Sequence, residues 1–194
     1  SSMKAARVAA STQLSGPEAR LDTPQAALIA KVHDALYASK VVSYAQGFDL
    51  MRAMIERKAW QLDLGGIASI WRGGCIIRAA MLDDILIAYQ ANQQLQNLMQ
   101  NNVFRHRLLE IQDNTRSAIQ SAINARIPVP VMMASLSYFD SFTSDWLPAN
   151  LVQAQRDFFG AHTYQRLDKP RGEYFHTNWT GRGGDVTSTV WKKG

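Results

Sequence analysis

A long stretch without helix breakers constrains the fold of this chain more than any other feature. Between Gln25 and about Gln61 the sequence contains no proline and a single glycine, Gly47. Thr23 and Pro24 come just before it and suit an N-cap and a first helical position. Small and apolar side chains recur along it at helical spacing: Leu28, Val32, Ala35, Leu36, Ser39 and Val42. The pattern predicts one unusually long helix, packed against several neighbours.

Further helices are predicted between the glycine and proline residues that interrupt the rest of the chain. Asp63 suits the N-cap of a short helix, and longer helices are predicted over Ile76–Ala91, Asn101–Ile127 and Val131–Phe142. On the helix from Asn101, one face carries Phe104, Leu108, Ile111, Thr115, Ala118 and Ala122. Toward the N-terminus, Gly16–Pro17 breaks any helix. These predicted helices follow one another with no strand between them.

The segment from Pro148 to about Gly160 predicts one more helix, and the character of the sequence changes soon after it. Proline suits the first turn, where its missing N–H costs little. Gly160 would let the helix end in a left-handed turn. Four residues recur at three- to four-residue spacing and are predicted to share a buried face: Leu151, Ala154, Phe158 and Ala161.

Residues 163–194 read as a polar, glycine-rich tail with one short strand candidate, Glu173–Thr177. The tail is also rich in aromatic residues: Tyr174, Phe175, Trp179 and Trp191. Because such residues are rare in disordered segments, we expect them to be buried on another surface, most simply a partner subunit. The sequence therefore predicts an all-α domain of about six or seven helices over residues 1–162. It predicts an extended tail over residues 163–194 that allows one short strand or hairpin.

Much of the positive charge lies in this tail. The whole chain carries a net charge of +5, and residues 163–194 contain six basic and three acidic residues, a difference of +3. The basic residues are Arg166, Lys169, Arg171, Arg182, Lys192 and Lys193; the acidic ones are Asp168, Glu173 and Asp185. A basic tail favours an anionic ligand such as a phosphorylated metabolite or a dinucleotide. Nucleic acid is a weaker alternative, because no known binding motif accompanies the charge.

The remaining composition bears on compartment and cofactors. Cys75 is the only cysteine, so no internal disulfide can form, and no cluster of metal-ligand residues is apparent. No apolar run approaches the roughly 20 residues that a membrane span needs. The first residues lack the apolar core of a signal peptide. We expect a cytoplasmic protein with no membrane partner and no metal.

Two residues near the end of the last predicted helix are candidates for binding an anion. Arg156 lies in its last turns, and His162 lies just beyond it. A guanidinium offers planar, bidentate donors to phosphate or carboxylate, and an imidazole adds a donor whose charge changes near neutral pH. Alternatively, Arg156 pairs with an acidic neighbour and His162 caps the helix C-terminus, where cations are favoured. Spacing alone leaves both interpretations open.

The amino-acid sequences of five stretches indicate a resemblance to a known family. They are Ala35–Lys40, Ser43–Phe48, Ile70–Arg78, Asn150–Tyr164 and Phe175–Gly181. Together they closely resemble the C-terminal part of 6-phosphogluconate dehydrogenase, and the resemblance covers nearly the whole chain. The resemblance implies an oxidoreductase that uses NADP to decarboxylate 6-phosphogluconate oxidatively to ribulose 5-phosphate. That reaction belongs to the pentose phosphate pathway and to gluconate utilisation.

The resemblance also implies which parts of such an enzyme this chain holds. Each subunit of the family has a Rossmann domain, a helical domain and a tail that threads into the other subunit of a homodimer. This chain resembles a fragment that begins inside the helical domain. The Rossmann fingerprint and the family's catalytic Lys and Glu lie upstream of it. We therefore expect no catalytic residue in this chain and no dehydrogenase activity from the chain by itself.

Residue by residue, the resemblance assigns Arg156 and His162 to the contact with 6-phosphogluconate bound in the neighbouring subunit. Ser188 and Thr189 align with a serine-rich stretch that approaches NADP across the dimer, although Val190 and Trp191 depart from the family pattern there. The main rival hypothesis is a helical homodimerisation module that binds no ligand. A nucleic-acid binder that uses the basic tail is the third.

Overall fold

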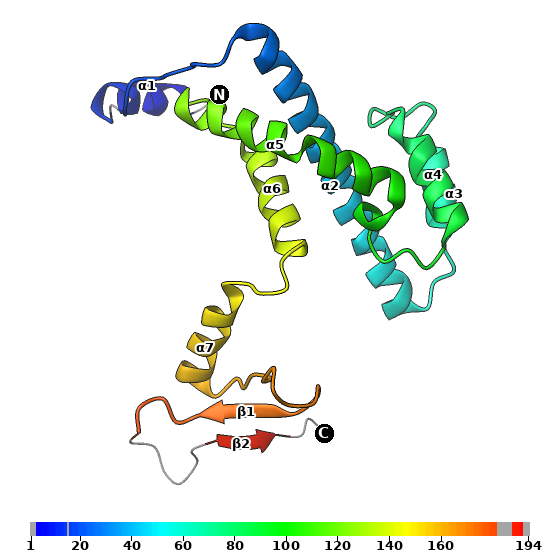
Figure 1. Ribbon diagram of the computed structural model, residues 1–194, viewed down its shortest axis with the longest axis vertical. Helices are drawn as coiled ribbons and strands as arrows, with labels where there is room; N and C mark the ends of the chain where they lie inside the picture. The colour runs from blue at the N-terminus through cyan, green and yellow to red at the C-terminus, as the bar shows by residue number, and fades with distance from the viewer. Residues whose placement is uncertain (1–2, 15, 182–187, 192–194) are drawn as a thin grey trace. The chain divides into compact units, whose positions relative to one another are not determined.

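The computed structural model of the 194-residue chain describes residues 3–14, 16–181 and 188–191. In chain order its elements are α1 (Lys4–Gln13), α2 (Gln25–Lys58), α3 (Leu64–Ile70), α4 (Met81–Ala91), the 3-10 helix η1 (Leu98–Gln100), α5 (Asn102–Asn124), α6 (Pro130–Phe142), α7 (Ala149–Gly160), β1 (Tyr174–Thr177) and β2 (Ser188–Trp191) (Figure 1). The described residues thus confirm the predicted all-α fold, and the two strands form the hairpin that the prediction allows. The chain divides into two compact units, residues 1–140 (unit 1) and residues 141–194 (unit 2).

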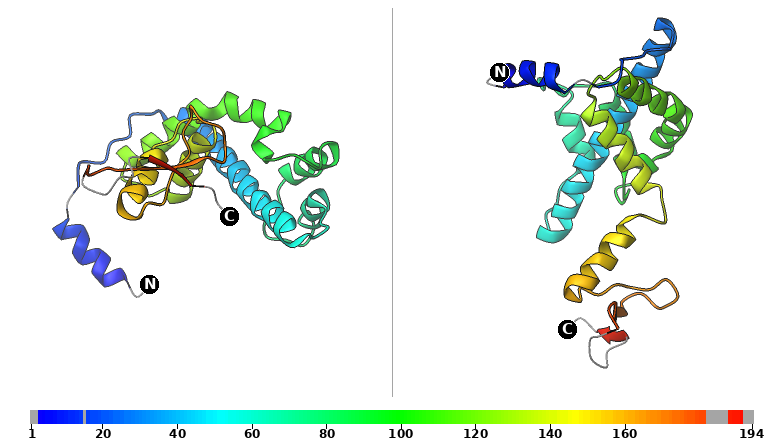
Figure 2. Two further views of the ribbon diagram at one scale, coloured as in Figure 1. Left: turned by 90° about the horizontal axis from the view of Figure 1, so that it is seen from below. Right: turned by 90° about the vertical axis from the view of Figure 1, so that its left-hand side faces the viewer.

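Unit 1 is built around the predicted long helix. The helices α2 and α5 pack against each other, and α3 and α4 lie beside the C-terminal half of α2 (Figures 1 and 2). The aromatic ring of Phe48 on α2 contacts the rings of Trp71 and Tyr89, at centroid distances of 5.7 and 5.1 Å. The largest fully buried apolar side chains are Phe48, Phe104, Leu82, Ile85, Leu98 and Ile111. One apolar core therefore joins α2, α4, η1 and α5.

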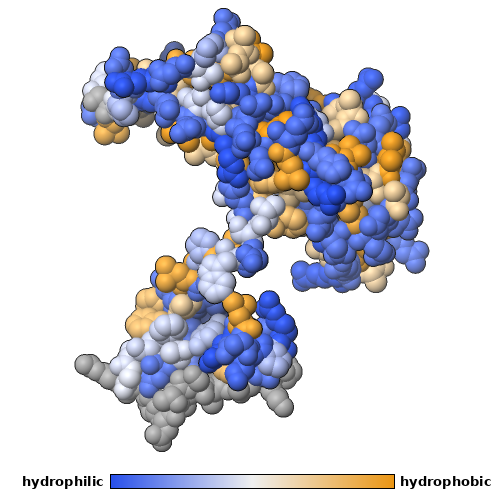
Figure 3. All heavy atoms as spheres, in the orientation of Figure 1, coloured by the Kyte–Doolittle hydropathy of each residue, from blue (hydrophilic) through white to orange (hydrophobic). Residues whose placement is uncertain are grey.

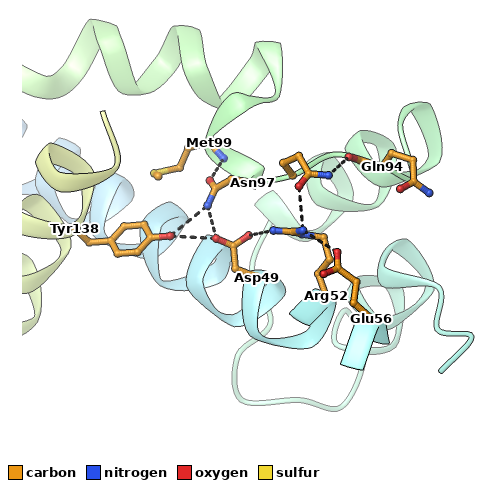
Figure 4. Close-up of polar contacts among 8 residues, drawn as sticks. Asp49, Arg52, Glu56, Gln94, Asn97, Met99 and Tyr138 are labelled. Atoms are coloured by element: carbon orange, nitrogen blue, oxygen red, sulfur yellow. Dashed lines mark hydrogen bonds and ion pairs between the residues drawn. The ribbon is translucent and has the colours of Figure 1, made fainter. Parts of the chain in front are cut away.

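A polar cluster at one edge of this core ties three elements together (Figure 4). The carboxylate of Asp49 on α2 accepts hydrogen bonds from the amide of Asn97, at 2.6 Å, and from the hydroxyl of Tyr138 on α6, at 3.1 Å. The side-chain oxygen of Asn97 also accepts from the backbone N–H of Met99, at 2.9 Å, and so caps η1. Because Asn97 is buried, these bonds satisfy polar groups that would otherwise be costly to bury.

Most predicted helices of unit 1 are confirmed, with corrections at some of their ends and one helix that the pattern misses; α5, for example, ends at Asn124 and not at Ile127. Pro24 is the N-cap of α2, and Thr23 makes no capping bond, because its hydroxyl faces Ser121 at 3.5 Å. The helix predicted from Ile76 begins only at Met81. The residues between Gly74 and Met81 form turns, so the apolar run there is not helical. The pattern does not predict α1, a helix with no buried residue.

Unit 2 combines α7 with an antiparallel hairpin. β1 pairs with β2, so that Tyr174 lies opposite Trp191 and Thr177 lies opposite Ser188. The predicted strand Glu173–Thr177 therefore matches β1. Tyr164 forms an isolated bridge with Phe175, which brings the segment after α7 back along β1. The predicted domain boundary between residues 162 and 163 falls within unit 2 and stays a prediction.

Candidate functional site

The helix α7 begins and ends close to where the sequence predicts. Pro148 is its N-cap, and Gly160 is its last helical residue. The left-handed turn comes one residue later than predicted, at Ala161, whose φ is 50° and whose N–H donates to the carbonyl of Asp157 at 2.9 Å. The glycine at position 160 also allows a close contact with a side chain. A Cβ there would lie 3.1 Å from Nε2 of His162, so the imidazole packs directly against the bare backbone.

The apolar face predicted for α7 is not buried within this chain. Leu151 is 76% exposed and Phe158 is 53% exposed, Ala161 is exposed as well, and Ala154 alone of the four is half-buried. The prediction of a buried face is therefore wrong for the chain alone, because α7 turns a different side toward the hairpin. Orange, hydrophobic atoms gather over α7 in Figure 3, where its large exposed side chains are Leu151, Val152, Phe158 and Phe159.

The side that α7 turns inward carries a fully buried carboxylate, Asp157. Its Oδ1 accepts a hydrogen bond from the N–H of Thr163, at 2.9 Å, and lies 3.0 Å from Nδ1 of His176. Its Oδ2 accepts from the N–H of Thr177, at 3.0 Å, and from the indole N–H of Trp179, at 2.8 Å. One side chain thus joins the end of α7, the end of β1 and the residues after it.

These partners decide the charge of Asp157. Burial by itself raises the pKa of a carboxyl group, because the charged form loses its water. The four hydrogen bonds favour the charged form and outweigh burial, so the pKa of Asp157 lies below its ordinary value. The carboxylate is therefore negative at neutral pH. No sequence pattern predicts the role of Asp157, because its hydrogen-bond partners lie six to 22 residues further along the chain.

An open cleft of about 910 Å³ lies beside this anchor. Both predicted anion-binding residues line it, so the structure brings Arg156 and His162 together. Nη1 of Arg156 donates to the amide oxygen of Gln153, at 3.1 Å. Among the described residues, neither Arg156 nor His162 forms an ion pair with a carboxylate. The described residues therefore do not support the alternative in which Arg156 pairs with an acidic neighbour.

The cleft also contains basic residues that the sequence analysis counted only as tail charge. Arg166 and Arg171 both line it. Nε of Arg166 donates to Asp168 at 2.8 Å, so that charge is already paired, and the guanidinium lies over the ring of Phe175 at 5.6 Å. No carboxylate pairs with Arg171 in the described part of the chain. The surplus of positive charge in residues 163–194 is the sequence signal that points to these residues.

Unit 1 has a second hollow, of about 480 Å³, that holds two further basic residues. Lys40 from α2 and Arg78 from the turn before α4 line it, together with Ser43 and Tyr44. The hydroxyl of Tyr44 donates to the carbonyl of Ile77, at 2.7 Å, and fixes the turn against α2. Both basic residues belong to stretches that carry the family resemblance, but no spacing or motif in the sequence predicts a role for either. The rest of the lining is largely apolar, because Leu36, Ile76, Ile77, Val131 and Met132 contribute to it.

The two predicted cofactor residues are placed only in part. Ser188 and Thr189 lie in β2, opposite Thr177 and His176. Their side chains lie outside the described residues, so their role toward NADP stays a prediction. No group of three or more metal-ligand side chains gathers within the described ranges. None of the described helices has both the length and the apolar character needed to cross a membrane.

Fold and cleft together define a helical domain that presents basic side chains from the end of its last helix. The chain belongs to the 6-phosphogluconate dehydrogenase family, because residues 1–179 match the model of the 6-phosphogluconate dehydrogenase C-terminal domain. The predicted family is thereby confirmed. It is a family of oxidoreductases, and this chain corresponds to its C-terminal domain.

Individual relatives give the same result. The chain is 48% identical over 190 residues to "6-phosphogluconate dehydrogenase, decarboxylating" of Rattus norvegicus, which covers 97% of this chain and 39% of the rat protein. It is 50% identical over 159 residues to the protein of the same name from Treponema pallidum (strain Nichols), covering 82% of this chain and 33% of that protein. The chain thus spans about two fifths of the length of the rat relative.

A solved structure is also similar. It is that of Plasmodium falciparum 6-phosphogluconate dehydrogenase, studied in its apo form, with its cofactor NADP+ and with its substrate 6-phosphogluconate. The TM-score is 0.84 at 40% sequence identity, and the match covers 91% of this chain and 38% of the Plasmodium chain. The helical fold is therefore shared with an enzyme that binds both molecules.

Proposed function

We propose that this chain is the substrate-binding and dimer-forming C-terminal part of a 6-phosphogluconate dehydrogenase, in which Arg156 and His162 contact 6-phosphogluconate. One observation carries the proposal: both side chains line a single open cleft, and no carboxylate among the described residues pairs with either. The guanidinium supplies a permanent positive charge and a fork of donors, and the imidazole supplies a second donor. A phosphorylated sugar acid is an anion of the kind that such donors select.

The role proposed for these residues is to orient the substrate. When bound, NADP would supply the hydride acceptor for the oxidation. Arg156 and His162 hold the anionic sugar acid in one position, which lowers the barrier by fixing the reacting groups relative to each other. We propose no residue of this chain for proton transfer.

The second part of the proposal is a homodimer, in which residues 163–194 pack on the partner subunit together with α7, to which Asp157 joins them in their own chain. The exposed apolar side chains of α7 support it, because Leu151 and Phe159 are each 76% exposed in the single chain. Apolar patches of this kind commonly mark protein–protein interfaces. Closed two-fold dimers are also the commonest assembly of soluble proteins. Through this dimer, Arg156 and His162 would reach substrate held by the other subunit.

Kinetics of the full-length protein test the substrate role. Replacing His162 by alanine should raise the KM for 6-phosphogluconate and leave the KM for NADP nearly unchanged. A normal KM for 6-phosphogluconate would return His162 to a packing role at the helix end. A raised KM for NADP alone would show that His162 acts on NADP binding and not on 6-phosphogluconate binding.

Sedimentation and ligand-binding measurements separate this proposal from its rivals. A homodimerisation module without a ligand would sediment as a dimer and bind neither 6-phosphogluconate nor DNA. A nucleic-acid binder would bind duplex DNA at physiological salt, with an affinity that falls steeply as salt is raised. The isolated chain is expected to sediment as a dimer and to form no NADPH above a blank.

A further inference from the structure

One amide side chain contacts both ends of the candidate site. Gln153 lies on α7 one turn before Arg156, is half-buried and lines the cleft. Its Oε1 accepts a hydrogen bond from Nη1 of Arg156, at 3.1 Å. Its Nε2 donates to the backbone carbonyl of Thr163, the residue that follows His162. The acceptor and the donor of a single amide are therefore used in the only orientation that satisfies both partners.

The segment that carries His162 needs such support. Ala161 has a φ of 50° and Thr163 a φ of 57°, so the residues on both sides of His162 lie in the left-handed region that L-amino acids seldom adopt. Conformations of this kind persist only where surrounding contacts hold them. The buried carboxylate of Asp157 holds the N–H of Thr163, and Gln153 holds its carbonyl.

We propose that Gln153 is a positioning residue, whose amide fixes the guanidinium of Arg156 and the backbone beside His162 in one arrangement. The inference rests on the proposed function, in which these two residues bind 6-phosphogluconate. Gln153 itself carries no charge for the ligand, so its effect passes through its two partners. Loss of the amide releases a flexible guanidinium and one support of the turn at the same time, and both losses weaken binding of the anion.

Equilibrium titration of 6-phosphogluconate into the full-length protein tests the inference. Gln153→Met keeps the length of the side chain and helix propensity but removes both hydrogen bonds. We expect the Kd for 6-phosphogluconate to rise about 10-fold, with an unchanged Kd for NADP. The matched control is Gln155→Met on the same helix, because Gln155 is exposed and does not line the cleft. The control should bind 6-phosphogluconate as wild type does.

A double-mutant cycle separates positioning from a merely structural role. If Gln153 acts through Arg156, the two substitutions Gln153→Met and Arg156→Ala together should weaken binding by clearly less than the product of their separate effects. Multiplicative effects would overturn the inference. Should Gln153→Met not fold, Gln153→Glu serves instead. The glutamate keeps the acceptor for Arg156, loses the donor to Thr163 and neutralises the guanidinium, so we expect an even larger rise in Kd.

The outcomes also distinguish this inference from the proposed function. If Arg156→Ala binds 6-phosphogluconate as tightly as wild type, the proposed function fails. If Arg156→Ala binds weakly while both Gln153 variants bind normally, the proposed function stands and the positioning role of Gln153 is wrong.

Discussion

The two units of this chain are stabilised in different ways. In unit 1 the fully buried side chains are mostly apolar and come from α2, α4, η1 and α5, with Phe48 and Phe104 the largest. In unit 2 the described residues contain two buried side chains, Asp157 and Phe175, and the more buried of them is a carboxylate. Unit 1 therefore depends on non-directional burial of apolar surface, whereas unit 2 depends on a few hydrogen bonds of fixed direction.

This difference bears on function. Directional bonds hold a backbone in one arrangement, and in unit 2 they hold the turn that carries His162 beside the cleft. They supply little apolar burial, however, and α7 keeps large apolar side chains exposed. In such a unit, hydrogen bonds fix the local backbone, but little apolar surface is buried. That combination supports the proposed homodimer, in which a second subunit covers the exposed side chains and completes the site.

The largest effect is expected in the apolar core of unit 1. Phe48→Ala removes a ring that contacts Trp71 and Tyr89, and should lower the free energy of unfolding by about 3–5 kcal/mol. Urea unfolding of the full-length protein, followed by fluorescence and by circular dichroism, measures it. Leu50→Ala, at an exposed position on the same helix, is the control. A loss below about 1 kcal/mol would contradict the assignment of the core.

A smaller and local effect is expected from Asp157→Asn in unit 2. The amide is neutral and brings its own donors toward the donors that face the carboxylate, so the loss should be about 1–3 kcal/mol. Hydrogen exchange should become faster at the amides of Thr163 and Thr177, while the amides of α5 keep their protection. Equal loss of protection in both units would show that the two are not stabilised separately.

The same variant has a signature in its pH dependence. An unfolded aspartate has a pKa of about 3.9, and the pKa of Asp157 in the folded chain lies below that value. Between these two values the unfolded chain binds more protons, so stability rises with pH. The contribution of Asp157 is therefore complete above the unfolded pKa and is lost as the pH falls through the folded pKa. Asp157→Asn should abolish this part of the pH dependence, which is measured as hydrogen-exchange protection at the amides of Thr163 and Thr177.

The smallest effect compares one glycine from each unit. A Cβ on Gly47 in α2 would meet no atom within 4 Å, so Gly47→Ala should stabilise by about 0.5–1 kcal/mol. A Cβ on Gly160 would displace the ring of His162, so Gly160→Ala should stabilise less and shift the imidazole signals of His162 in NMR spectra. Identical gains in stability, with an unshifted His162 ring, would show that the close approach at Gly160 has no consequence.

The sequence predicts much of unit 1 because its helices follow a simple periodicity. The long helix and the buried face of α5 were both evident from spacing, since Phe104, Leu108 and Ile111 are all buried. The start of α4 was wrong because apolar residues before Met81 form turns instead of a further helical turn. The helix α1 has no buried residue, so no apolar pattern marks it.

The candidate site was less predictable from pattern alone. Spacing placed Arg156 near the end of a helix but left its role open, and the family resemblance supplied the role. The same spacing predicted a buried face that includes Phe158, whereas α7 buries Asp157 instead. Partners as distant as Trp179 decide that outcome, and periodicity within one helix carries no information about them.

The central claim is that Arg156 binds 6-phosphogluconate, and equilibrium binding tests it most directly. Calorimetric titration of the full-length protein should give a Kd for Arg156→Ala about 10- to 150-fold above wild type, because a charged hydrogen bond contributes about 1.5–3 kcal/mol. The control, Arg105→Ala, removes an exposed charge from α5 outside the cleft and should leave the Kd unchanged. Equal affinities for wild type, Arg156→Ala and Arg105→Ala would contradict the claim.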